Sequence, residues 1–371
     1  MTFQEEPKGG TARIGWIDFC RAYAAFFVIV RHVHPVRGTM VWFADELTYR
    51  GLIFLFFFLS GYFVHAHKEA CGLKKYIDSR RFFQLLWAYL FWSAMGVVLL
   101  VPLYHYESIV AGDFSFISLS ALGDWMGLNP PGPHTYPLNV PLWFLKNLMV
   151  LALFAPLLYN MNNKILIVLV LASLACGEIL LTVDTGDHSK EFAIEAIPGR
   201  TYENLMSVGF FSLGIIVRRS FSLAFFDKFI KDYAWLPITA ALLLFPMVHF
   251  WGFFPPCKSC ELVAISVLMI MSISALCEKY CPAVFKLVAR YGPAMMFVYT
   301  THYIVLQYLQ LIIRRSNNYL VCTLQEMALP VMALCICLAF YHLLTAHFPS
   351  FMHRFAFVKP NKGTHQTVHS S

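Results

Sequence analysis

The chain has 371 residues, of which 58% are hydrophobic and only 13% are charged, and its mean hydropathy is +0.61. Soluble domains carry roughly 25% charged residues, so this composition excludes an ordinary soluble protein and indicates a chain surrounded by a lipid bilayer. The net charge of +7 does not indicate a nucleic-acid partner, because membrane proteins concentrate Lys and Arg in their cytoplasmic loops.

Ten segments approach the length of about 20 apolar residues that a helix needs to cross a bilayer. They cover residues 14–34, 50–67, 82–104, 141–160, 163–183, 204–217, 233–254, 261–278, 290–313 and 326–348. If the N-terminus is cytoplasmic, 18 of the 28 Lys and Arg residues fall on the inner side, 8 on the outer side and 2 within the first segment. This imbalance predicts that both termini are cytoplasmic.

We therefore expect an all-α, polytopic membrane helix bundle with about ten transmembrane helices. Residues 1–13 would form a cytoplasmic N-terminal segment, 14–350 the integral membrane domain and 351–371 a cytoplasmic polar tail.

The first segment carries three ionisable residues on one helical face. Arg21 and His32 are eleven residues apart, which is three turns plus about 20° and a rise of about 16 Å. Asp18 lies three residues before Arg21 and can pair with it across one turn. Because intramembrane charge is costly, this stripe indicates a functional site. The alternative is a structural salt bridge with a histidine at the membrane interface.

The second and third segments carry two further candidates. Ser60 and Gly61 permit a close approach of helices, while the Ser60 hydroxyl could instead make a polar contact in a ligand tunnel. Arg80 and Arg81 open the third segment. A basic cluster there is typical of a topology determinant, and it also suits phosphate binding.

The connection from residue 104 to 141 contains no Lys or Arg and is rich in Gly, Pro, Ser and aromatic residues. Structureless loops of this length are usually functional or disordered. Trp143 follows it and suits either an interface anchor or stacking on a sugar ring. Further along, Tyr299 precedes His302, which lies near mid-membrane and indicates a polar interior.

Cys257 and Cys260 form a CxxC pair in a predicted outer loop. The pair could bind a metal, form a local disulfide in an oxidising compartment, or do neither. No metal is expected at the residues of the charged stripe.

Taken together, these motifs resemble the acyltransferase-3 family, integral membrane acyltransferases that modify cell-surface glycans. The matching blocks cover most of the chain in the family's order, and they are Ile17-Asp18-x-x-Arg21 with His32, Phe57-Phe58-Leu59-Ser60-Gly61-Tyr62, the Arg-rich start of the third segment, Trp143-Phe144-Leu145 and Tyr299-x-x-His302. The family often has two arginines three residues apart in the third segment. Here Arg81 is followed by Gln84 at that spacing, with Arg80 adjacent.

The resemblance implies a ten-helix bundle in which the Arg21–His32 pair is essential and cytoplasmic acyl-CoA supplies the acyl group. No cofactor would be bound permanently, since acyl-CoA, most commonly acetyl-CoA, is a co-substrate. The acceptor would be a hydroxyl of a cell-surface polysaccharide or its lipid-linked precursor. The location would be the bacterial cytoplasmic membrane, where glycan-assembly proteins could be partners.

On this hypothesis His32 is the general base and Arg21, paired with Asp18, contacts the donor's phosphate or pantetheine portion. Arg80 and Arg81 would bind acyl-CoA. Ser60 or His302 could donate to the developing oxyanion, while Trp143 and the 105–140 loop would bind the acceptor, beside Tyr299.

Two other classes remain open from the sequence. A transporter could use Asp18, Arg21 and His32 as a proton or substrate relay, but it is expected to show inverted repeats, which we do not find. A flippase-like or non-catalytic partner of a glycan assembly system is the other possibility.

Overall fold

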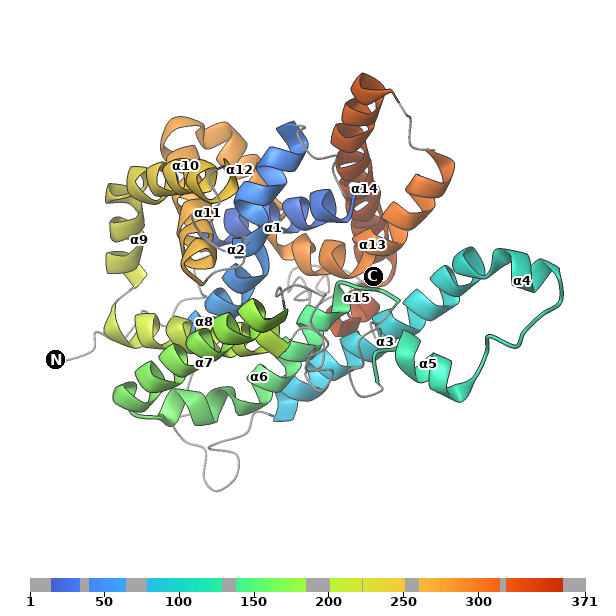
Figure 1. Cartoon of the computed structure of the whole chain (residues 1–371), viewed down its shortest axis with the longest axis horizontal. Helices are drawn as coiled ribbons and strands as arrows, with labels where there is room; N and C mark the ends of the chain where they lie inside the picture. The colour runs from blue at the N-terminus through green and yellow to red at the C-terminus, as the bar shows by residue number, and fades with distance from the viewer. Residues whose placement is uncertain are drawn as a thin grey trace, which may run out of the picture.

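The computed structural model describes residues 15–33, 40–64, 79–128, 138–184, 201–221, 223–250, 260–313 and 318–355. Within these ranges the chain is helical and has no β-strand (Figure 1). The elements are α1 (Gly15–His32), α2 (Met40–Tyr62), α3 (Ser79–Tyr104), α4 (Tyr106–Val110), α5 (Leu119–Trp125), α6 (Leu142–Asn160), α7 (Asn163–Asp184), α8 (Thr201–Ser220), α9 (Leu223–Asp232), α10 (Trp235–Phe250), α11 (Cys260–Tyr280), α12 (Pro282–Arg290), the 3-10 turn η2 (Gly292–Ala294), α13 (Met295–Ile312), α14 (Tyr319–His347) and α15 (Pro349–Phe355).

Each of the ten apolar segments coincides with a long helix, although the boundaries differ. Helix α2 begins at Met40, ten residues before the predicted start. The segment 290–313 begins at the end of α12 and continues through η2 into α13. Pro293 lies in η2 and has no backbone N–H to donate, so the chain turns there before α13 starts.

Five helices of the described part are long and apolar enough to cross a membrane, within residues 81–104, 142–160, 163–180, 262–280 and 319–347. Helix α1 is 18 residues long but carries Asp18, Arg21 and Arg31. The described helices therefore indicate a membrane protein, while the count of ten spans and the cytoplasmic termini stay predictions.

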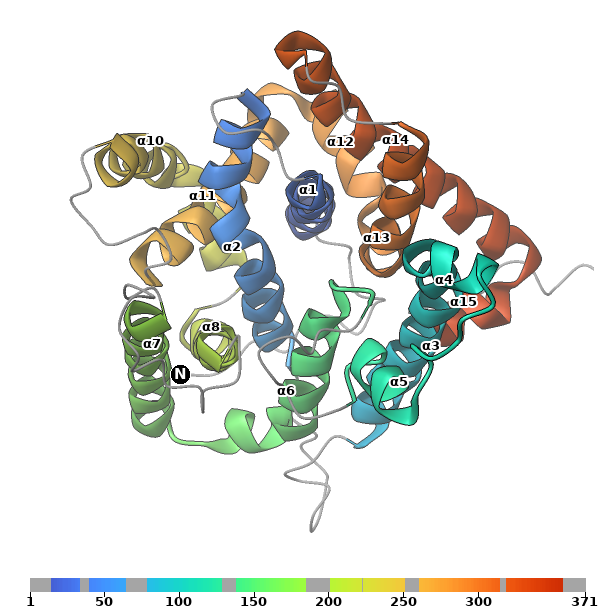
Figure 2. The same cartoon turned by 45° about the vertical axis from the view of Figure 1, so that its right-hand side comes forward.

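Helix α1 occupies the middle of the bundle. It packs against α2, α11, α12, α13 and α14, and Figure 2 looks nearly along its axis with these helices around it. Most of its side chains are buried, including Asp18. A charged helix avoids lipid in this position, because its neighbours cover it with protein.

A crossing of small residues joins α2 to α8. A methyl group added at Gly61 would overlap the carbonyl of Phe211, and one added at Gly214 would overlap the Phe58 carbonyl. The two backbones therefore touch directly, as in other small-residue crossings of membrane helices. This confirms the close helix approach predicted at Ser60 and Gly61.

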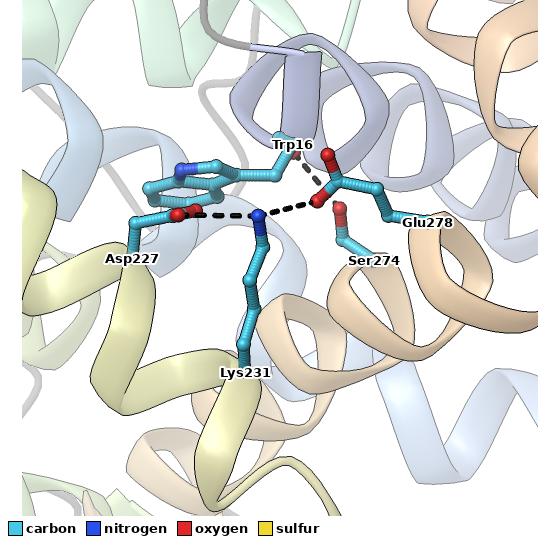
Figure 3. A network of polar contacts seen from close by, with 5 residues as sticks. All are labelled: Trp16, Asp227, Lys231, Ser274 and Glu278. Atoms are coloured by element: carbon cyan, nitrogen blue, oxygen red, sulfur yellow. Dashed lines mark hydrogen bonds and ion pairs between the residues drawn. The ribbon is translucent and has the colours of Figure 1, made fainter.

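Polar contacts tie α9 to α11 near the start of α1 (Figure 3). The Lys231 ammonium lies 3.1 Å from Asp227 Oδ2 and 2.9 Å from Glu278 Oε2. Partial burial lowers the pKa of Lys231, but the hydrogen bonds to the Glu278 and Asp227 carboxylates outweigh it and raise the pKa. On the same helix as Glu278, the Ser274 hydroxyl donates to the Trp16 carbonyl at 3.2 Å.

The opposite side of α9 is aromatic and exposed. Phe221, Phe225, Phe229 and Tyr233 follow one another every four residues, and their neighbouring ring centroids are 5.0, 6.5 and 5.1 Å apart. A short helix with one charged and one aromatic side is typical of an element lying in the membrane interface. Helix α9 is too short to span a bilayer.

Short helices lie in two regions outside the ten long segments. The connection 104–141 is not a structureless loop in its described part, because it contains α4 and α5. Ser118 begins α5 by accepting a hydrogen bond from the Ala121 amide. The predicted tail from residue 351 begins inside α15, whose Phe355 ring lies 4.6 Å from the Phe91 ring of α3. Bundle packing therefore extends past residue 350.

Gly214→Ala tests the crossing of α2 and α8. The added methyl group overlaps backbone that cannot move without separating the helices, so we expect a loss of about 1–3 kcal/mol in unfolding free energy. Thermal unfolding of purified protein in detergent measures it. Ala175→Val, which enlarges an exposed side chain on α7, is the control and should leave the midpoint unchanged. Equal midpoints for both variants would contradict a direct backbone contact.

Candidate active site

Asp18 and Arg21 form the predicted pair on α1. Arg21 Nη1 lies 3.5 Å from Asp18 Oδ1, which is a long ion pair across one turn. The Asp18 side chain is 8% exposed and the Arg21 side chain 40%. The carboxylate is thus held inside the bundle, while much of the guanidinium stays accessible to a ligand.

The backbone of Gly292, at the start of η2, lies directly against the Asp18 side chain. A Cβ atom at position 292 would come within 2.6 Å of Asp18 Oδ1, so only glycine fits. The partial positive charge at the beginning of a helix favours a carboxylate there. Gly292 is not among the residues predicted from the sequence. The signal that could have found it is the Gly292-Pro293 pair, which is typical of a turn.

His32 and His302 lie next to each other at the other end of the stripe. Their ring centroids are 5.4 Å apart, and the Tyr303 ring meets the His32 ring edge to face at 5.1 Å. His302 is fully buried, whereas His32 is half-buried. The structure therefore brings together two residues that the sequence places 270 positions apart.

The backbone of α13 fixes the tautomer of His302. Its Nδ1 lies 3.1 Å from the Val298 carbonyl oxygen, one turn earlier. Because a carbonyl can only accept, Nδ1 carries the hydrogen and Nε2 keeps a lone pair. Nε2 is buried and has no hydrogen-bond partner among the described residues. This geometry favours His302 as an acceptor over the predicted role of oxyanion donor.

Two hydrogen bonds hold α13 to the start of α6. The Tyr299 hydroxyl donates to the Pro141 carbonyl at 2.8 Å, and Asn139 Nδ2 donates to the Thr300 carbonyl at 2.8 Å. Asn139 is fully buried and was missed from the sequence, since a single Asn in a Pro-rich stretch reads as a turn residue. Tyr299 thus contributes to positioning His302, and its predicted contact with substrate stays a prediction.

The remaining candidates lie on neighbouring helices. Ser60 is half-buried on α2, and Trp143 is half-buried in the first turn of α6. Arg81 is half-buried at the start of α3, and the side chain of Arg80 lies outside the described residues. Helix α3 packs on α6, α13 and α15. Of these three helices, only α13 is also a main neighbour of α1. The predicted roles of these four residues stay predictions.

The end of α5 is anchored next to Trp143. The Tyr89 hydroxyl donates to the Met126 carbonyl at 2.7 Å, and Lys146 Nζ donates to the Gly127 carbonyl at 2.9 Å. Within this connection the His105 and Phe116 rings stack at 4.2 Å, with Trp125 at 5.7 Å from His105. An ordered aromatic surface therefore flanks the start of α6.

One buried acid was not selected from the sequence. Glu326 on α14 is 2% exposed, and Cys322 Sγ lies 3.6 Å from its Oε1. A carboxyl group inside a membrane helix is a functional candidate by default. Among the described residues, no group of three His, Cys, Asp or Glu side chains could hold a metal ion. Cys257 and the side chain of Cys260 lie outside the described residues.

Comparison with known proteins gives one match. The acyltransferase-3 family model, described as an acyltransferase domain, matches residues 14–344. No curated protein and no solved structure matches the chain. The matched region includes α1, α13 and nearly all of α14, which carry the stripe, His302 and Glu326.

Gly292→Ala tests the contact with Asp18. The methyl group would displace the carboxylate from its position beside Arg21, and we expect a loss of about 1–3 kcal/mol in unfolding free energy. Differential scanning calorimetry in detergent measures the change. Gly15→Ala on α1, the helix that carries Asp18, is the control, because its methyl group would meet only the edge of the Phe285 ring at 3.1 Å. A Gly292→Ala protein as stable as this control would show that Asp18 is not held there.

Proposed function

Because the chain belongs to the acyltransferase-3 family, a family of membrane acyltransferases, we propose that it moves an acyl group from cytoplasmic acyl-CoA to a hydroxyl of a cell-surface polysaccharide or its lipid-linked precursor. Acetyl is the proposed group, and a bacterial cytoplasmic membrane is the proposed location. The protein would need no permanently bound cofactor, since acyl-CoA is consumed as co-substrate. Glycan-assembly proteins are the proposed partners.

The observation that carries this proposal is the polar stripe of α1 inside the bundle. One end presents the accessible Arg21 guanidinium held by Asp18, and the other presents His32 beside His302. The two ends are separated by about 16 Å along the helix. A long donor can lie along such a stripe, with its phosphates at Arg21 and its thioester near His32.

His32 is the proposed general base. It takes the proton of the acceptor hydroxyl, whose oxygen bonds to the acyl carbonyl carbon while the carbon–sulfur bond breaks. The proton then passes to the departing CoA thiolate, which leaves as the thiol. General base help of this kind contributes about 10²–10⁴ in rate.

The donor end combines Arg21 with Arg80 and Arg81. Guanidinium groups bind phosphates through two parallel hydrogen bonds, which suits the phosphates of CoA. Arg21 pairs with a carboxylate that packs directly against Gly292. This second contact supports a precise position for Arg21.

The acceptor end combines Trp143 with the aromatic surface of the 105–128 segment. Trp143 stands at the start of α6, close in sequence to Lys146, which anchors the end of α5. Aromatic faces suit the apolar faces of sugar rings, and the lack of Lys and Arg in this connection suits a neutral glycan. Ser60 is the proposed donor to the oxyanion.

His32→Ala tests the proposed reaction. Membranes containing the protein are incubated with radiolabelled acetyl-CoA, and labelled glycan and released CoA are measured. We expect transfer to fall by at least about 10²-fold, because the base is lost, while the protein still inserts. His347→Ala, at an exposed histidine on α14, should retain activity. Normal transfer by the His32 variant would remove His32 from the mechanism, and uptake of label without acylation would favour a transporter.

Trp143→Ala tests the acceptor end separately. Loss of a stacking surface should raise KM for the acceptor about 10-fold, which corresponds to a loss of about 1.4 kcal/mol in binding. KM for acetyl-CoA should stay unchanged, because the proposed donor contacts are made by Arg21, Arg80 and Arg81 and not by Trp143. Steady-state kinetics with varied acceptor and fixed donor measure the split. A change confined to the donor KM would contradict this assignment.

A further inference from the structure

His302 has the geometry of a hydrogen-bond acceptor that is fixed in place. Its Nδ1–H is bound to the Val298 carbonyl at 3.1 Å, which leaves the lone pair on Nε2. This Nε2 atom is buried and accepts no hydrogen bond from the described residues. Buried polar atoms in folded proteins are nearly always paired, so an unpaired one indicates a function or a ligand.

The imidazole ring of His32 lies next to that of His302. The centroids of the two imidazoles are 5.4 Å apart with 42° between their planes. This separation is compatible with a hydrogen bond between the two rings when a nitrogen of each faces the other. The His302 ring is held by its own helix and is fully buried, whereas His32 is half-buried.

We propose that His302 is a positioning residue for His32, with Nε2 accepting a hydrogen bond from a ring N–H of His32 when His32 holds the acceptor's proton. This inference rests on the proposed acyl transfer. The proton leaves the acceptor hydroxyl, resides on His32 while the new ester bond forms and the thioester bond breaks, and ends on the CoA thiol. His302 itself neither gains nor loses a proton.

The logic is that of a catalytic histidine oriented by a buried acceptor, which fixes the imidazole and stabilises its cation. Asp18 cannot serve, because fourteen residues of helix place it about 21 Å from His32. A neutral imidazole takes the place of a carboxylate, so no second charge is buried beside His32. Two cations this close would repel, so the pair carries one proton, and the complete burial of His302 disfavours its cation and leaves the proton on the half-buried His32.

The supports of His302 agree with this role. Asn139 and Tyr299 join α6 to α13 on either side of residue 300, through the Thr300 carbonyl and the Pro141 carbonyl. Helix α13 also packs directly against α1, which carries His32. His302 is therefore positioned by contacts among α13, α6 and α1, and precise orientation of a base requires such support.

The variants His302→Gln and His302→Phe distinguish a hydrogen-bond acceptor at position 302 from a residue that carries a proton. Gln keeps an acceptor oxygen near the position of Nε2 but cannot carry a proton, whereas Phe keeps the ring and removes the acceptor. We expect His302→Phe to lower kcat about 10²-fold, and His302→Gln to stay within about 10-fold of the unaltered protein. KM for radiolabelled acetyl-CoA should be unchanged in both, and thermal unfolding shows that both are folded.

Tyr308→Phe is the matched control on α13, since it removes a hydroxyl that donates to the Leu99 carbonyl of α3 at 2.6 Å. It should keep its kcat. Equal losses in the Gln and Phe variants would make His302 a proton carrier and overturn the proposal, as would full activity of His302→Phe. Absence of transfer by the unaltered protein would instead overturn the proposed function. If the unaltered protein transfers the acyl group but the His302 variants do not behave as expected, the proposed function stands and only the role of His302 is wrong.

Discussion

Burial of a charged helix at the centre of the bundle is the constraint on which the other features depend. Helix α1 carries Asp18, Arg21 and His32, and exposing such groups to lipid costs several kcal/mol each. Helices α2, α11, α12, α13 and α14 cover it. The same burial that keeps the charges out of lipid also creates a polar interior, so structural and chemical requirements are met by one arrangement.

Close backbone contacts make this arrangement possible. Gly61 and Gly214 let α2 and α8 touch, and Gly292 lets η2 approach Asp18. Hydrogen bonds from side chains to backbone carbonyls then join neighbouring elements. Asn139 donates to the Thr300 carbonyl, and Ser274 donates to the Trp16 carbonyl. In a membrane, where apolar surface gives little preference for protein over lipid, such contacts decide which helices become neighbours.

Sequence reasoning located the long helices and the charged stripe, because both depend on periodicity within one segment. The Asp18–Arg21 pair and the close approach at Ser60 and Gly61 follow from spacing along a single helix. Gly292, Asn139 and Glu326 were missed. Each acquires its meaning from a neighbour distant in the chain, and no local pattern distinguishes them from ordinary turn or polar residues. The short helices α4 and α5 were also missed, because helices of 5 and 7 residues are too short to show a periodic apolar pattern.

The sequence by itself determined that this is a helical membrane protein of the acyltransferase-3 family with Arg21 and His32 on one face of its first helix. Helical periodicity and hydrophobicity are local properties, so they can be read along the chain. Only the tertiary structure decided that His32 lies against His302 and that His302 presents a lone pair. That pairing depends on the packing of α1 against α13, whose facing surfaces are set by the whole bundle.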